Sequence, residues 1–136
     1  MRRYALLPHT ADARVSIEGS DLRELFMAGL EGMASIIKRD ACTDSLEVSD
    51  TISLTASDIT SLFIDFLSDI LTRTQEKKVV YCKVEFQQLY PKILQGVIRG
   101  KKVNSFDRDV KAVTYHEADI VKNKQGNWET NIIFDI

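Results

Sequence analysis

The sequence predicts a two-layer α+β domain, with two helices packed on a largely antiparallel (mixed) sheet of about seven strands. Apolar residues recur at helical spacing in two segments of the first half, and short alternating runs of polar and apolar residues occupy most of the second half. No internal repeat, linker or low-complexity tract interrupts the 136 residues, so we assign residues 1–136 to a single domain.

Two amphipathic helices are expected, over residues 21–38 and 58–73. In the first helix, Asp21 opens a capping box ahead of the apolar positions. In the second helix, Ser57 is the expected N-cap, and Asp58 follows in the first turn, where a carboxylate favours the helix dipole. The apolar stripe of each helix needs a sheet or another helix to cover it.

The remaining segments alternate with a period of two residues, which is typical of strands. The expected strands cover residues 2–7, 13–18, 45–55, 80–87, 93–99, 110–121 and 128–136. The segment 110–121 is expected to form one long strand. The turn cluster at 123–127 then joins it to the last strand as a hairpin.

Composition excludes several classes of protein. The net charge is −2, and no apolar run approaches the roughly 20 residues that span a bilayer. The N-terminus also lacks the apolar region of a signal peptide, so a cytoplasmic protein is expected. Cys42 and Cys82 lie 40 positions apart without a CxxC motif, so reduced and mostly buried thiols are expected rather than a disulfide or a zinc site.

Positive charge gathers in one part of the chain. Residues 76–111 hold nine basic and four acidic side chains, whereas residues 1–75 hold seven basic and twelve acidic ones. A basic stretch in an acidic protein fits an anionic partner at one face. A solvated surface of strands and loops explains the same composition equally well.

The side chains that could carry chemistry lie in three segments, at residues 9–12, 109–116 and 134–136. Asp12, Asp135 and the terminal carboxylate of Ile136 are hard oxygen donors, which suit Ca²⁺ or Mg²⁺. Two alternatives to a metal site stay open. In one, Asp135 pairs with a cationic side chain or faces water. In the other, His9 and Asp12 only hold the shape of a turn through hydrogen bonds.

Lys111 alternates with apolar neighbours on its predicted strand. Its ammonium group therefore either reaches the sheet edge or presents a charge to a site. By strand parity His116 faces the other side, and a structural, hydrogen-bonded histidine is expected there. None of the motifs GxSxG, P-loop, GxGxxG or HExxH occurs, which argues against an enzyme.

Several segments follow one another in an order typical of one family. They are His-Thr-Ala-Asp at 9–12, Gly-Ser-Asp-Leu-Arg-Glu-Leu-Phe at 19–26, Gly-Met at 32–33, Val-Lys-Ala-Val-Thr-Tyr-His at 110–116 and Asp-Ile at 135–136. Taken together, over essentially the whole chain, they resemble the archease family. The chain departs from the family pattern at Arg14 and in the loop 100–109, where two lysines follow Gly100 instead of the usual Glu.

The resemblance implies a non-catalytic accessory protein of the GTP-dependent RNA ligase that joins a 3′-phosphate or 2′,3′-cyclic phosphate end to a 5′-hydroxyl end in tRNA splicing and RNA repair. Such a protein promotes formation of the ligase–GMP intermediate and multiple turnover. The resemblance also implies a divalent metal ion, with Ca²⁺ favoured over Mg²⁺, at Asp12, Asp135 and Ile136. It implies a part in ligase activation for Lys111 and His9.

The resemblance implies that the RNA-splicing ligase is the partner and that it is bound transiently. Contacts with tRNA and GTP are expected to be indirect, and no membrane is expected to be involved. Two other functions stay open. One is a general nucleic-acid or protein chaperone that uses the basic face formed by residues 76–111. The other is a small metal-dependent phosphoesterase that uses Asp12, His9 and Asp135, although no nucleophile with a base is evident.

Overall fold

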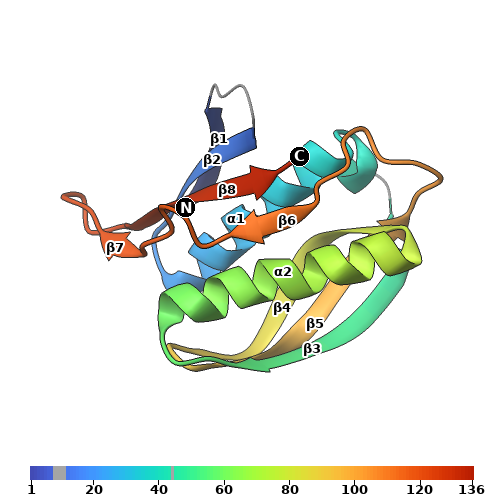
Figure 1. The fold of residues 1–136 in the computed structure, drawn as a ribbon. Helices are drawn as coiled ribbons and strands as arrows, with labels where there is room; N and C mark the ends of the chain where they lie inside the picture. The colour runs from blue at the N-terminus through green and yellow to red at the C-terminus, as the bar shows by residue number, and fades with distance from the viewer. Residues whose placement is uncertain (8–11, 44) are drawn as a thin grey trace.

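The structure is a computed structural model that describes residues 1–7, 12–43 and 45–136, and it has the predicted α+β class (Figure 1). Its elements are β1 (Arg2–Leu7), β2 (Asp12–Gly19), α1 (Leu22–Ile37), the 3₁₀ helix η1 (Ala41–Thr43), β3 (Val48–Thr55), α2 (Ile59–Lys77), β4 (Val79–Tyr90), β5 (Ile93–Lys102), β6 (Ala112–Thr114), β7 (Val121–Lys122) and β8 (Trp128–Asp135). No helix in these ranges is long and apolar enough to cross a bilayer.

The described strands divide between two antiparallel sheets. One sheet has the order β1-β2-β8-β6, with β7 also paired to β8, and the other has the order β3-β5-β4. Helix α1 packs on β1 and β2 of the first sheet and on β4 of the second, so it lies between the two sheets. Helix α2 packs on β4 and β6 and crosses the front of the molecule in Figure 1.

An aromatic cluster joins the helices in the core. The ring of Phe26 on α1 lies 4.9 Å from that of Phe63 and 5.4 Å from that of Phe66, both on α2. Gly29 permits this approach, since a Cβ at that position would lie 2.6 Å from the ring of Phe63. The apolar stripes predicted for both helices are therefore buried against each other and against the sheets.

Both helices begin at a carboxylate cap. Asp21 accepts a hydrogen bond of 2.8 Å from the amide of Glu24, and Asp58 accepts one of 2.8 Å from the amide of Ser61. The prediction of Ser57 as the second N-cap was therefore wrong by one residue, because the Asp58 carboxylate reaches that amide. Helix α2 also runs beyond the predicted residue 73, to Lys77.

The predicted single strand over 110–121 is wrong. The chain forms only β6, turns at Glu117, which has a φ of 61°, and returns as β7. Side chains satisfy backbone amides in this turn, since Thr130 Oγ1 accepts from the amide of Asp119 at 3.1 Å and Thr60 Oγ1 from that of Ile120 at 3.2 Å. These bonds replace strand partners, which the alternating sequence pattern does not reveal.

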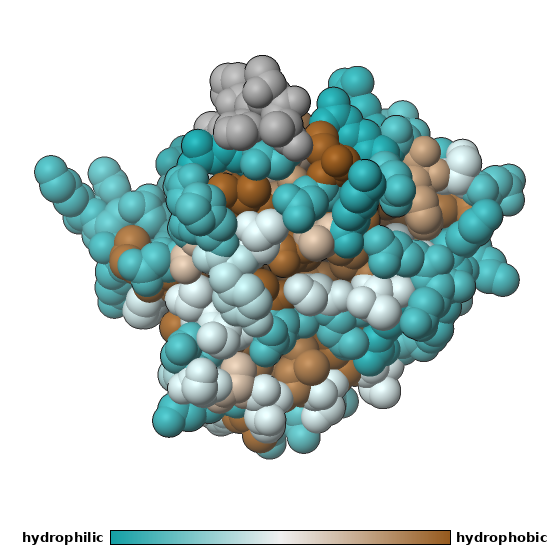
Figure 2. Space-filling view, viewed as in Figure 1, coloured by the Kyte–Doolittle hydropathy of each residue, from teal (hydrophilic) through white to brown (hydrophobic). Residues whose placement is uncertain are grey.

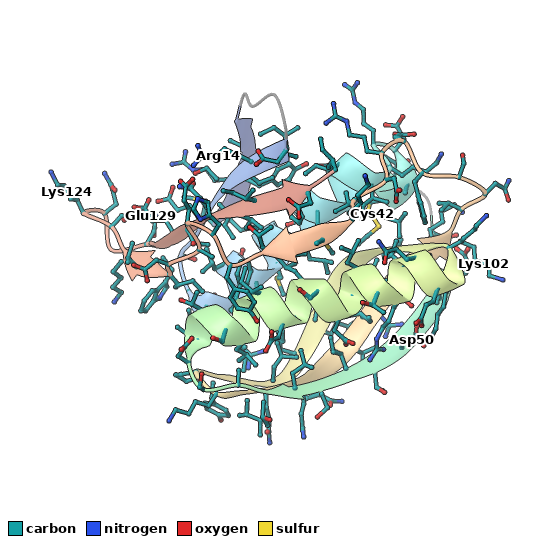
Figure 3. All side chains as sticks on the ribbon, in the orientation of Figure 1. Arg14, Cys42, Asp50, Lys102, Lys124 and Glu129 are labelled. Atoms are coloured by element: carbon teal, nitrogen blue, oxygen red, sulfur yellow. A yellow bond between two sulfur atoms is a disulfide. The ribbon has the colours of Figure 1, made fainter. Side chains whose placement is uncertain are left out.

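The expectation of reduced, buried cysteines is also wrong. Cys42 and Cys82 form a disulfide with Cα atoms 5.6 Å apart, drawn in yellow beside Cys42 in Figure 3. Helix η1 packs on β4 and brings the two residues together although 40 positions separate them in sequence. Cys42 is exposed and Cys82 is half-buried. Sequence spacing alone does not reveal such a contact.

A buried carboxylate ties the last hairpin to β2. Glu18 is only 7% exposed, and its carboxylate accepts hydrogen bonds from Asn123 at 2.7 Å, from Asn127 at 2.8 Å and from Arg3. The two amides, followed by the guanidinium, lower the pKa of Glu18 to about 2. Asn123 also donates to Glu129 at 3.2 Å, so one amide bridges two neighbouring carboxylates.

Reduction of the disulfide is expected to lower the free energy of unfolding by roughly 2–4 kcal/mol, because the bond restricts the unfolded chain. Urea unfolding with and without reductant measures this change. The matched control is the double variant Cys42→Ser/Cys82→Ser, whose stability should not respond to reductant. Alkylation of both thiols in the native, unreduced protein would contradict the pairing.

Acid is expected to destabilise the fold partly through Glu18. Its pKa is lowered from 4.5 to about 2, so its contribution is complete above pH 4.5 and is lost as the pH falls toward 2. Glu18→Gln should lower the urea midpoint of unfolding at neutral pH, and the midpoint of this variant should fall less steeply between pH 4.5 and 2. The control Glu76→Gln, at an exposed position, should change neither property. An unchanged pH profile in Glu18→Gln would show that the network does not stabilise the fold.

Candidate functional site

The predicted carboxylates meet at one end of the five-stranded sheet. Asp12 is the first residue of β2 and Asp135 the last residue of β8, and the antiparallel register places them directly opposite each other. Val15 and Phe134 are fully buried on the face toward α1, so strand alternation directs Asp12 and Asp135 to the opposite, outer face. Side chains at directly opposed positions lie close enough to act on one ligand.

Lys111 lies beside this pair. Its backbone amide donates a hydrogen bond of 2.7 Å to the carbonyl of Asp135, and its side chain is exposed. Strand β8 lies between β2 and β6, and Ala112 is the partner of Asp135 on the β6 side. Ile136 follows Asp135 and is 36% exposed. The structure therefore brings Asp12, Asp135, Ile136 and Lys111 to one sheet end.

The remaining predicted site residues do not join this group. His9 lies outside the described residues. His116 is exposed in the turn after β6, where its amide donates to Thr114 Oγ1 at 3.3 Å, whereas Lys111 precedes the other end of that strand. The parity argument for separating Lys111 from His116 assumed one continuous strand, but the turn separates them instead.

The donor chemistry of the sheet end fits a hard divalent cation. Two carboxylates on directly opposed positions repel each other, and a cation between them relieves that repulsion. Oxygen donors suit Ca²⁺ and Mg²⁺ rather than zinc. Within the described ranges no group of three or more His, Cys, Asp or Glu side chains forms a metal cluster, so a site here needs a further donor beyond Asp12 and Asp135.

Arg14, where the sequence departs from the family pattern, has a structural contact of its own and does not join the carboxylate pair. It lies two residues along β2 from Asp12, on the same face, and its guanidinium forms an ion pair with Glu117 in the turn after β6. Its Nε is buried and has no hydrogen-bond partner among the residues that the structure describes. Arg14 therefore fastens the β6–β7 turn to the outer face of the sheet, a contact that sequence reasoning missed.

Ca²⁺ is expected to raise the melting temperature of the protein, because a ligand that binds only the folded state stabilises it. Asp12→Asn and Asp135→Asn should each weaken Ca²⁺ binding by on the order of tenfold, because each removes a charged donor. Calorimetric titration measures the affinity, and Glu85→Gln, an equal charge change at an exposed position of the three-stranded sheet, is the control. Unchanged Ca²⁺ affinity in both variants would contradict a metal site at this sheet end.

Comparisons with known proteins identify the family of the chain. A profile of the archease protein family (MTH1598/TM1083) matches residues 4–136. Protein archease of Pyrococcus furiosus is 29% identical over the full length of both chains, and that of Methanosarcina acetivorans is 27% identical, over 99% of this chain and 97% of the relative.

Solved structures share the fold. The solution structure of Methanobacterium thermoautotrophicum protein 1598 superposes with a TM-score of 0.80, at 24% identity, over 98% of each chain. The crystal structure of an archease from Thermotoga maritima, described as a possible chaperone, gives a TM-score of 0.64 at 20% identity, over 96% of this chain and 94% of that one. Since the family profile covers nearly the whole sequence, this chain belongs to the archease family.

Proposed function

We propose that this protein is a metal-binding, non-catalytic activator of the GTP-dependent RNA ligase of tRNA splicing and RNA repair. In this role it promotes formation of the ligase–GMP intermediate and multiple turnover. The observation that carries the proposal is the β2–β8 register, which places the half-buried Asp12 opposite the exposed Asp135 at one end of the sheet. Membership of the archease family supports an accessory role.

The chain's own residues would act by binding and orientation. Asp12 and Asp135, with Ile136 as the expected third ligand, would hold a divalent cation, which supplies positive charge for phosphate oxygens when bound. The backbone bond from Lys111 to Asp135 fixes the lysine backbone next to that position, and we propose that its ammonium supplies a second positive charge there. His9 is proposed as a further activating residue. Such positioning is electrostatic, and the covalent chemistry stays with the ligase.

The proposal is tested with the cognate ligase, labelled GTP and an RNA with a 3′-phosphate end. The protein should raise both ligase guanylylation and the number of ligations per ligase. Asp12→Ala and Lys111→Ala should each reduce this activation by on the order of tenfold or more, because each removes a charge from the site. Lys124→Ala and Glu85→Gln, at exposed positions elsewhere, serve as charge-matched controls.

Two results would count against the proposal: no activation of a ligase that is active by itself, or full activation by both Asp12→Ala and Lys111→Ala. Each variant is first checked for an unchanged melting temperature, so that loss of folding is not taken for loss of function.

A chaperone function is the second candidate, and one observation favours it. Lys77 of α2 and Lys101 and Lys102 of β5 belong to the basic segment 76–111, and they line a common cavity. The description of the Thermotoga maritima archease as a possible chaperone points the same way. This function predicts that charge reversal at Lys101 and Lys102 abolishes activity while Asp12→Ala leaves it intact, which is the opposite of the expectation for the metal site.

A further inference from the structure

A basic cavity of about 760 Å³ lies where α2 ends and β5 passes into the loop 103–111. Five of its lining residues are lysines and two are acidic, Asp40 and Glu76, which leaves an excess of three positive charges; the lysines are Lys38, Lys77, Lys78, Lys101 and Lys102. Figure 3 shows Lys102 beside the last turn of α2, and Figure 2 shows hydrophilic side chains gathered over this end of the molecule. The cavity is separate from the carboxylate pair, since neither Asp12 nor Asp135 lines it.

The backbone brings these lysines together. The β4–β5 register pairs Lys102 with Val79, the residue after Lys78. The amide of Val103 donates a hydrogen bond of 2.9 Å to the carbonyl of Lys78, which fixes the start of the loop against the end of α2. Lysines far apart in sequence thus lie at the same end of the three-stranded sheet.

The helix dipole accounts for only part of this cluster. Cations are favoured at a helix C-terminus, which explains Lys77 and Lys78 at the end of α2. It does not explain Lys101 and Lys102, which belong to a strand. The strand lysines therefore add positive charge beyond what the helix end needs.

The charges of the cavity are available to an outside anion. Three of the lysines form ion pairs at its border, Lys77 with Asp50 at 3.2 Å, Lys38 with Asp107 at 3.7 Å and Lys101 with Glu47 at 3.8 Å. Such exposed pairs are worth about 1 kcal/mol or less, so a phosphate can replace the carboxylate at little cost. The structure gives Lys78 and Lys102 no ion pair in the part of the chain that it describes, although the Glu47 carboxylate accepts a hydrogen bond of 3.0 Å from the amide of Lys102.

We propose that this cavity, the lysine pocket, binds the phosphodiester backbone of RNA without reading its bases. Asn104 and Ser105 add uncharged donors to the lysines, which suits phosphate oxygens. Its lining residues include no aromatic side chain on which a base could stack. They also lack the aromatic and large apolar anchors of a protein interface, since only Ala41 and Val103 are apolar, so an acidic protein is the less suitable occupant.

The inference goes beyond the ligase proposal and does not depend on it, because RNA binding is measured on the isolated protein. Fluorescence anisotropy follows a labelled single-stranded oligouridine and an oligoadenine of equal length over a range of salt concentrations. Both should bind equally, and binding should weaken with salt. Lys78→Gln/Lys102→Gln should weaken binding by on the order of tenfold at low salt and reduce the log–log salt slope by about 1.4, since each lost phosphate contact contributes about 0.7.

The control is Lys92→Gln/Lys124→Gln, which removes the same charge at two exposed positions away from the pocket and should leave affinity within about twofold of the original. Equal losses in the two double variants, a strong preference for one base, or no RNA binding would each overturn the inference. Displacement of the RNA by polyglutamate as readily as by unlabelled RNA would overturn it in favour of an acidic polypeptide.

Discussion

The candidate site depends on the antiparallel register between β2 and β8. A slip of one residue would turn Asp12 or Asp135 toward the core, because side chains alternate between the two faces of a strand. Buried residues oppose such a slip. Val15 and Ile132 face each other in the ladder, and both are completely buried. The apolar core against α1 therefore fixes the position of the carboxylates on the outer face.

Strands β2 and β8 carry two opposed carboxylates at each end of their ladder, and the side chains around the two pairs differ. At one end Glu18 lies opposite Glu129, and Asn123 donates hydrogen bonds to both carboxylates while Arg3 pairs with Glu18. The hydrogen bonds at this end also lower the pKa of Glu18 to about 2. At the other end the half-buried Asp12 lies opposite the exposed Asp135, next to the backbone of Lys111, and this is where we propose that a divalent cation binds.

Local patterns predicted much of the fold and of the site. The 3.6-residue period located α1 and α2, and the alternating pattern of residues 128–136 placed Asp135 in the last strand. Contacts distant in sequence were not predictable in this way. The Cys42–Cys82 disulfide depends on the packing of η1 against β4, and the turn at Glu117 depends on hydrogen bonds from other elements. A positive segment was evident, but its folding into one pocket with Lys38 required the three-dimensional arrangement.

We propose that Asp12 and Asp135 act as one unit in ligase activation. The decisive measurement is a double-mutant cycle with Asp12→Asn, Asp135→Asn and the combined variant, with ligase guanylylation as the readout. If the two carboxylates hold one cation, the combined variant should lose less activation than the product of the two single losses. If the losses of the single variants multiply in the combined variant, or if neither variant loses activation, the two residues do not form a shared site.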